Sequence, residues 1–271
     1  MLEFVDVTFR YRSDTAPALD AVSLTLAPGE MLAVVGVNGS GKSTLARLCD
    51  GLLTPSSGRV LVDGLDTAHE TTIWDVRALV GMVFQDPDDQ IVGTVVEEDC
   101  AFGPENLGLP CAEIRERVDG ALAVAGLEGL QRREPHLLSE GQKQRLAIAG
   151  ALAMRPRYLI FDEPTAMLDP AGRRLAIGVM QRLARDEGHG VLIVSHEVSD
   201  VVRADRVIAL AAGAVAFEGT PERLFSDPDA VRTCGLHRGA CGLVAEDLRA
   251  RGVAVPDTAV DPESLVDALW R

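Results

Sequence analysis

The sequence predicts an α/β fold in which helices cover both faces of a largely parallel sheet. Short apolar runs alternate with stretches of helical periodicity, in the order that such a sheet requires. These runs are residues 80–84, 158–161 and 191–194. Two further segments, 2–9 and 22–26, alternate apolar and polar side chains, as antiparallel edge strands do. A glycine-rich turn at 36–43 joins the apolar run 31–35 to a helical stretch. We therefore expect a mixed sheet with an antiparallel edge.

The remaining segments suggest a main domain, residues 1–226, and a C-terminal unit, residues 227–271. Apolar residues recur at helical spacing in 112–125 and 141–154, which predicts a helical insertion at about 93–155 between two core strands. A hairpin at 207–217 turns at Ala212-Gly213, and a short helix opens at Pro221. In the C-terminal unit, one predicted helix has an apolar face and ends before Gly252, and a second begins at Asp261-Pro262. The apolar residues of these two helices are Ala240, Leu243, Val244, Leu248, Leu265, Val266, Leu269 and Trp270. Two short amphipathic helices need a surface to pack on.

Composition bounds the classes of function. With 271 residues, 47% of them hydrophobic, the chain can bury a large core in one or two domains. No apolar run approaches the roughly 18 to 20 residues that cross a bilayer, and the first residues do not resemble a signal peptide. The five cysteines show no Cys-x-x-Cys spacing, which favours reduced packing residues. The net charge of −15 disfavours a nucleic-acid partner. We expect a soluble cytoplasmic chain.

A phosphate-binding loop occupies residues 36–43, which read Gly-Val-Asn-Gly-Ser-Gly-Lys-Ser. A strand, a glycine turn and a helix start let successive backbone N–H groups surround phosphate oxygens, where the helix dipole also favours negative charge. Lys42 is expected to reach the β- and γ-phosphates, and the Ser43 hydroxyl to bind magnesium. The chain is therefore predicted to bind a nucleoside triphosphate with Mg²⁺. A glycine turn in an unrelated fold is the weaker alternative.

Two carboxylates follow the apolar strand at 158–161. Asp162 is expected at the carboxyl end of that strand, beside the P-loop, where it can hold Mg²⁺ directly or through water. Glu163, one residue further, can orient and polarise the attacking water. Capping of the next helix is the alternative role for such a pair.

Residues 138–145, Leu-Ser-Glu-Gly-Gln-Lys-Gln-Arg, point to a family. Together with the P-loop and the two carboxylates, this segment resembles the signature of the ABC-transporter ATPases. The resemblance implies that the helix capped by Ser139, with Gly141 and Gln142, faces ATP bound by a second such chain, so that two ATP molecules join a head-to-tail dimer. The common signature has glycine where this chain has Glu140. A carboxylate there either weakens one site or turns away from the γ-phosphate.

Four further residues occupy positions where the resemblance implies a role. Gln85 follows the strand at 80–84 and matches the Q-loop glutamine, which contacts Mg²⁺ and the attacking water. His196 matches the switch histidine that bonds the γ-phosphate, and Asp169 belongs to the D-loop at the dimer interface. Tyr11 matches the aromatic that stacks on adenine, with Phe9 as the competing candidate. The remaining nucleotide contacts expected from the P-loop are Asn38, Gly39, Ser40, Gly41 and Thr44.

The segments 84–93 and 95–106 and the tail at 242–252 and 263–269 are similar to those of energy-coupling-factor ATPases. This resemblance implies ATP hydrolysis at the cytoplasmic face of the cell membrane. The implied partners are a transmembrane coupling subunit, a substrate-binding membrane subunit and a second ABC ATPase chain, identical or similar, paired through the tail. The implied cargo is a vitamin or a transition-metal ion. Within the Q-loop, the carboxylates of Asp86, Asp88 and Asp89 are expected to be solvated or to meet a basic partner.

Three other functions stay open at this stage. A soluble ABC ATPase of translation or DNA repair usually carries a second nucleotide-binding unit or long coiled coils, which this chain lacks. The ATPase subunit of another ABC importer type is a second alternative. A regulatory subunit that binds ATP without turnover is the third. Glu140 slightly favours this alternative, whereas Glu163 and His196 disfavour it.

Overall fold

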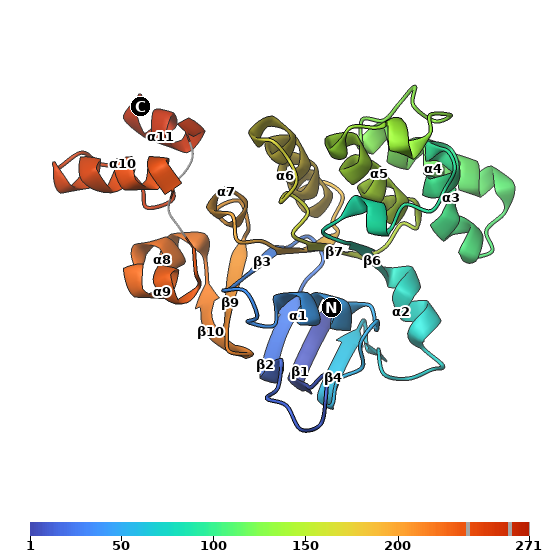
Figure 1. The fold of residues 1–271 in the computed structure, drawn as a ribbon, viewed down its shortest axis with the longest axis horizontal. Helices are drawn as coiled ribbons and strands as arrows, with labels where there is room; N and C mark the ends of the chain where they lie inside the picture. The colour runs from blue at the N-terminus through green and yellow to red at the C-terminus, as the bar shows by residue number, and fades with distance from the viewer. Residues whose placement is uncertain (237–238, 260–261, 271) are drawn as a thin grey trace.

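A computed structural model describes residues 1–236, 239–259 and 262–270 of the chain. At its centre lies a six-stranded sheet in the order β10-β9-β3-β8-β7-β6 (Figure 1). Five neighbouring strands are parallel, and β10 pairs antiparallel with β9 at one edge. The strands are β3 (Met31–Val35), β6 (Val80–Val83), β7 (Tyr158–Asp162), β8 (Gly190–Val194), β9 (Arg206–Ala211) and β10 (Ala214–Gly219). The predicted mixed α/β sheet with an antiparallel edge is confirmed.

The two opening strands lie outside this sheet. They form a second, antiparallel sheet in the order β2-β1-β4-β5, which packs below the central sheet in Figure 1. Its members are β1 (Leu2–Phe9), β2 (Leu19–Leu26), β4 (Ser57–Val62) and β5 (Leu65–Asp66). Their buried apolar residues share one cluster with the side chains of the main sheet that face them, among them Leu32, Val34 and Ile160. Sequence reasoning found β1 and β2 but not the pairing partner β4, whose first three residues, at 57–59, are all exposed.

Helices cover both faces of the main sheet. Helix α1 (Lys42–Cys49) packs between the two sheets, together with α2 (Ile73–Leu79) near the β6 edge. The opposite face carries α6 (Pro170–Arg185), α7 (Val198–Val201) and α8 (Pro221–Ser226). Two short 3₁₀ turns, η1 (Pro87–Asp89) and η2 (Pro135–Leu137), lie in the connections.

Three helices follow β6 before the chain returns in β7. They are α3 (Val96–Asn106), α4 (Cys111–Val124) and α5 (Glu140–Ala153). They pack on one another and share the large buried cluster of the upper face, through residues such as Val118, Leu122 and Leu146. The sequence predicted the last two helices; α3 was missed, since it contains Pro104 and Gly103, which weaken a helical pattern. The arrangement places the N-terminus of α5 near the carboxyl ends of the core strands.

The tail continues with α9 (Pro228–Thr233), α10 (Gly239–Ala250) and α11 (Pro262–Leu269). A small cluster of its own joins α10 to α11, with Ala245, Val255 and Ala259 buried. Leu243 and Val244 of α10 are 63% and 49% exposed, so they face away from this cluster. The side chain of Ala240 and the helix start at Asp261 lie outside the described residues. Within the described part of the chain, no helix is long and apolar enough to cross a membrane.

Candidate nucleotide-binding site

The P-loop connects β3 to α1 in the conformation that its glycines allow. Gly39 and Gly41 have φ angles of 80° and 106°, a region that side chains with a Cβ rarely adopt. A Cβ on Gly41 would lie 2.4 Å from the carbonyl oxygen of Ala18, so this position has no room for a larger residue. Gly41 is also the N-cap of α1, which leaves the first N–H groups of the helix pointing into the loop. The loop thus has the backbone shape of an anion site.

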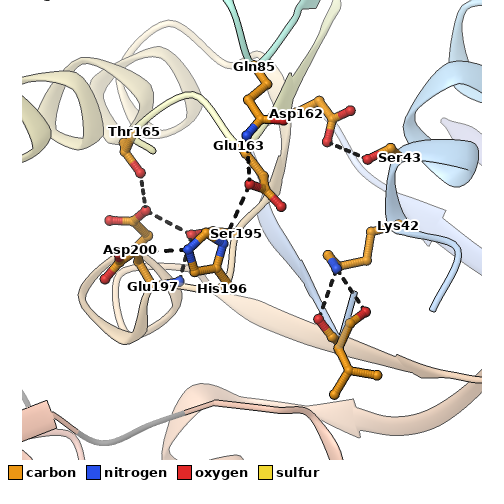
Figure 2. A network of polar contacts seen from close by, with 12 residues as sticks. Lys42, Ser43, Gln85, Asp162, Glu163, Thr165, Ser195, His196, Glu197 and Asp200 are labelled. Atoms are coloured by element: carbon orange, nitrogen blue, oxygen red, sulfur yellow. Dashed lines mark hydrogen bonds and ion pairs between the residues drawn. The ribbon is translucent and has the colours of Figure 1, made fainter. Parts of the chain in front are cut away.

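Lys42 is nearly buried, and its Nζ donates to the carbonyl oxygens of Gly36 and Val37, at 2.9 and 3.2 Å (Figure 2). Burial lowers the pKa of the Lys42 ammonium, while the carboxylates of Glu163 and Asp162 act in the opposite direction. The ammonium therefore lies in a pocket with little solvent around it. A phosphate in the loop would supply the negative charge that this desolvated cation lacks.

Ser43 and Asp162 meet across 119 residues of sequence. The Ser43 hydroxyl donates to Oδ1 of Asp162 at 3.1 Å, because α1 begins beside the carboxyl end of β7. Burial raises the pKa of Asp162, and the Ser43 hydrogen bond opposes that rise. A hydroxyl and a carboxylate side by side are the oxygen ligands that Mg²⁺ prefers. In the described residues, no group of three or more His, Cys, Asp or Glu is placed so that it could hold a metal ion.

Glu163 lies where three core strands end. Its backbone has φ 50°, an uncommon value for a residue with a side chain. Its Oε2 accepts from Nε2 of Gln85 at 3.3 Å, after β6, and lies 3.6 Å from Nδ1 of His196, after β8 (Figure 2). Because β6, β7 and β8 are parallel neighbours, the loops after them meet at one edge. The structure therefore brings the three predicted catalytic side chains into contact.

A cavity of about 320 Å³ joins Glu163 to the P-loop. Its lining is Tyr11, Ala18, Asn38, Gly39, Gly41, Lys42, Ser43, Thr44 and Glu163. Tyr11 is 60% exposed, and its hydroxyl lies 3.0 Å from Oγ1 of Thr44. Phe9, the competing candidate for the adenine contact, is buried in β1 and packs edge-on against the Tyr11 ring. Ser40 is buried, and within the described part of the chain its hydroxyl has no hydrogen-bond partner. Tyr11 is thus the aromatic that borders the cavity.

The signature residues lie at a second groove, apart from the P-loop cavity. Ser139 caps α5: its hydroxyl accepts from N–H of Gln142 at 3.4 Å, and its own N–H donates to the Gln142 side chain at 2.9 Å. Asp169 caps α6 by accepting from N–H of Gly172 at 2.6 Å. Ser139, Gly141 and Asp169 line a second groove of about 430 Å³, and among the described residues no P-loop side chain shares it. The predicted nucleotide contacts therefore fall into two groups within one chain.

The side chain of Glu140, beside the signature groove, pairs with a lysine of its own helix. Its Oε1 lies 3.1 Å from Nζ of Lys143, one turn further along α5. The same Nζ lies 2.7 Å from Oδ2 of Asp88, in the Q-loop turn η1. These two carboxylates hold the pKa of Lys143 above its ordinary value, Asp88 having the larger effect. Asp86 instead caps η1 by accepting from N–H of Asp88 at 2.9 Å. Two of the three Q-loop carboxylates that were expected to need a partner therefore have one in the chain.

Sequence reasoning missed a buried group behind the catalytic side chains. Asp200 of α7 is fully buried and accepts from the hydroxyls of Thr165 and Ser195 (Figure 2). Thr165 follows Glu163 by two residues, and Ser195 directly precedes His196. Asp200 follows the predicted histidine in the sequence, but no motif marks it. Only the fold shows that Asp200, Thr165 and Ser195 meet.

Comparison with known proteins agrees with this arrangement of strands, P-loop and signature. The family model described as "ABC transporter" matches residues 19–166, which is more than half of the chain. An energy-coupling factor transporter ATP-binding protein EcfA1 of Symbiobacterium thermophilum is 55% identical over 93% of this chain and 88% of its own length. A cobalt import ATP-binding protein CbiO of Syntrophus aciditrophicus is 44% identical over 100% of this chain and 97% of its own. The chain therefore belongs to the ATPases of the ABC transporter family, within their energy-coupling-factor group.

Solved structures show the same fold. The protein cbiO1 of Clostridium perfringens, described as part of the ABC transporter complex cbiONQ, superposes with a TM-score of 0.77 at 39% identity, over 85% of this chain and 92% of that one. The ATP-binding cassette MJ0796, in a dimeric post-hydrolysis state bound to ADP and Pi, gives a TM-score of 0.74 at 29% identity, over 82% and 99%. The predicted family and the fold class are confirmed. The roles assigned to individual residues stay predictions.

Proposed function

We propose that this chain is the ATP-hydrolysing subunit of an energy-coupling-factor importer, which drives uptake of a micronutrient through separate membrane subunits. The observation that carries the proposal is the contact of Glu163 with Gln85 and His196 beside the P-loop cavity. A chain that only binds ATP has no need of a partly buried carboxylate held between an amide and an imidazole at this edge. The proposal therefore favours turnover over regulatory binding.

In the proposed reaction, the P-loop N–H groups and Lys42 bind the β- and γ-phosphates, and Tyr11 stacks on the adenine. Ser43, Asp162 and Gln85 would hold Mg²⁺, which neutralises the charge that develops on the phosphates. Glu163 accepts a proton from, and orients, the water that attacks the γ-phosphorus. His196 donates a hydrogen bond to the γ-phosphate, and its 3.6 Å approach to Glu163 keeps both groups at the same phosphate.

The second half of each site would come from another chain. Ser139, Gly141 and Asp169 border a groove of their own, with Gln142 in the capping box beside it, so a head-to-tail pair would place this groove over the P-loop cavity of its partner. Exposed apolar side chains border the same groove: Met167 is 58% and Leu175 65% exposed. Burial of these side chains would stabilise the closed pair. The dimeric state of a similar cassette bound to ADP and Pi supports this arrangement.

The membrane partners follow from the relatives. A similar protein is described as part of a transporter complex, and another as a cobalt import protein, which supports a vitamin or a transition-metal ion as cargo. We propose that the chain sits at the cytoplasmic face of the cell membrane, bound to a transmembrane coupling subunit and a substrate-binding subunit. Residues 1–226 would form the ATPase domain, and residues 227–271 a dimerisation unit. The exposed Leu243 and Val244 give the second unit an apolar surface for pairing.

The Glu163→Gln variant tests the proposal. It keeps the shape of the side chain but loses the carboxylate, so turnover by the assembled complex should fall by about 10²- to 10⁴-fold. ATP should then accumulate in a closed dimer, which size analysis with radiolabelled ATP would detect. Glu187→Gln is the control. Glu187 lies just after the last residue of α6 and pairs with Arg182 of that helix, so its replacement should leave hydrolysis unchanged. Equal hydrolysis by wild type and Glu163→Gln would refute the assignment.

A further inference from the structure

The loops that carry Glu163 and His196 leave the sheet side by side. Asp162, the last residue of β7, is in register with Val194, the last residue of β8. The N–H of Glu163 donates to the carbonyl oxygen of Val194 at 3.0 Å, which ties the two strand ends together by backbone. Beyond this bond the two loops diverge, one toward the D-loop and the other toward α7. Their relative position must therefore be set by side chains.

One buried carboxylate bridges the two loops. Oδ2 of Asp200 accepts from Oγ1 of Thr165 at 2.6 Å and from Oγ of Ser195 at 2.9 Å. All three residues are at most 2% exposed. The Ser195 oxygen also accepts from N–H of Glu197 at 3.0 Å, so the backbone on both sides of His196 is fixed by the same group. Burial of a carboxylate is unfavourable unless it is hydrogen-bonded, and here the two hydroxyls provide those bonds.

An ion pair reinforces the bridge at the surface. Nη1 of Arg173, on the first turns of α6, lies 2.8 Å from Oε2 of Glu197. The guanidinium also lowers the pKa of Asp200, although burial is the larger influence and raises it. Helix α6 begins at the D-loop residue Asp169, which caps it. Two contacts of different kinds thus connect the D-loop side to the switch side.

The bridge lies directly behind the reactive pair. The N–H of Leu168 donates to the carbonyl oxygen of Thr165 at 3.1 Å, so Thr165 belongs to the turn that links Glu163 to Asp169. Glu163 itself has a positive φ, an unfavourable conformation that persists only where the surroundings hold it. A hydroxyl anchored two residues later is such a constraint.

We infer that Asp200 is a positioning residue, which aligns Glu163 with His196 by binding the hydroxyls of Thr165 and Ser195 and so couples the D-loop to the switch. This inference rests on the proposed roles of Glu163 and His196. Asp200 is not among the residues that line the P-loop cavity. It acts through the two loops, so its loss should affect the catalytic step more than ATP binding at the P-loop.

The test compares Asp200→Asn and Thr165→Val with wild type in the assembled complex. Each should lower kcat by about ten- to a hundredfold, because a small misplacement of catalytic groups has effects of this size. KM for ATP, and the affinity of the isolated chain for a fluorescent ATP analogue, should change by less than about threefold. The double variant should be no slower than the slower single variant, because both changes break one bridge. Ser199→Ala is the matched control: its hydroxyl donates at 3.4 Å to Oδ1 of Asp200, not to the Oδ2 atom that forms the bridge.

The outcomes separate this inference from the proposed function. If Glu163→Gln abolishes turnover while Asp200→Asn and Thr165→Val retain the wild-type kcat, Asp200 has no positioning role and the proposed function stands. A parallel loss of ATP affinity, unfolding temperature and kcat in both variants would mean a general structural role, and would also overturn the inference. In the Glu163→Gln background, Asp200→Asn should slow residual hydrolysis by less than about twofold, since the carboxylate it aligns is already gone.

Discussion

The two halves of the nucleotide site differ in how completely one chain builds them. The P-loop half is assembled inside the fold: Lys42, Thr44 and Asp162 are all at most 6% exposed. The signature half lies open, with Ser139 and Glu140 exposed at the start of α5 and Met167 and Leu175 exposed across the groove. In the proposed arrangement, the P-loop half binds ATP and a second chain supplies the signature half. The difference predicts that changes in the two halves can be separated by experiment.

The largest expected effect comes from breaking both halves in different chains. Lys42→Ala removes the ammonium that is expected to bind the β- and γ-phosphates. The variant should bind ATP at least about a hundredfold more weakly. Ser139→Arg should leave ATP affinity of the isolated chain unchanged but abolish turnover, because it blocks the helix end that faces the other nucleotide. Each variant alone is therefore expected to be inactive.

Mixing the two variants decides whether the halves combine between chains. In a mixed dimer one composite site keeps both an intact P-loop and an intact signature, and the other loses both. Equal mixing should restore roughly a quarter of wild-type hydrolysis, since half of the dimers are mixed and each has one complete site. Absence of rescue would count against the head-to-tail arrangement. If the natural partner is a different chain, the same changes are made across that pair.

A second prediction concerns the loss of stability caused by a buried carboxylate at the end of α1. Asp50 ends α1 and is buried, and burial raises its pKa to about 6. Its folded pKa therefore lies above the unfolded value of 3.8, so the folded state binds the proton more strongly. Stability contributed by the protonated group is complete below about pH 4 and is lost as the pH rises through about 6.

Asp50→Asn removes this dependence. The amide oxygen can still accept from N–H of Leu52, as the carboxylate does at 3.0 Å. Relative to wild type, the free energy of unfolding of the variant should rise by up to about 3 kcal/mol between pH 4 and pH 7.5. Urea denaturation at the two pH values measures it. Asp14→Asn, in the exposed loop between β1 and β2, should change little at either pH. A constant difference between Asp50→Asn and wild type would contradict the prediction.

The same contrast explains how much the sequence could predict. The P-loop, the carboxylates at 162–163 and His196 were found because each is a short motif at the end of an apolar strand, where chemistry and chain order coincide. The fold class followed from the same strands. Strand β4 was missed because it is largely exposed at its start, and α9 because its six residues carry too little periodicity.

Contacts between distant residues escaped sequence reasoning. Lys143 meets Asp88 across 55 residues, and Asp200 meets Thr165 across 35. The first pair depends on how α5 packs beside η1, and the second on the neighbouring strands β7 and β8, so no local pattern encodes either. The Q-loop acids were expected to be solvated or to meet a basic partner: Asp88 meets Lys143 within the chain, and Asp89 is exposed.

A third prediction examines the aromatic that closes the P-loop half. Tyr11→Ala should weaken ATP binding by about 1–3 kcal/mol, the size of one stacking contact between a base and an aromatic ring. Tyr11→Phe keeps the ring and loses only the contact with Thr44, so it should stay within about threefold of wild type. Phe9→Leu should reduce stability without altering ATP affinity, because Phe9 packs in β1. Titration of the isolated chains measures all three, and equal affinity of Tyr11→Ala and wild type would exclude the contact.

The smallest expected effect concerns the residue that departs from the common signature. Glu140 borders the groove, but its side chain is 54% exposed and its carboxylate pairs with Lys143. Replacement by glycine should therefore change hydrolysis by less than about fivefold, since exposed ion pairs contribute little and are screened by salt.

Lys143→Met releases both Glu140 and Asp88, so it should lower activity more at low salt than at high salt. If Glu140→Gly instead raised turnover by more than about tenfold at both salt concentrations, the carboxylate would be repelling the γ-phosphate of the partner. The signature half would then be weakened by its own sequence, and the two halves would differ in strength as well as in completeness.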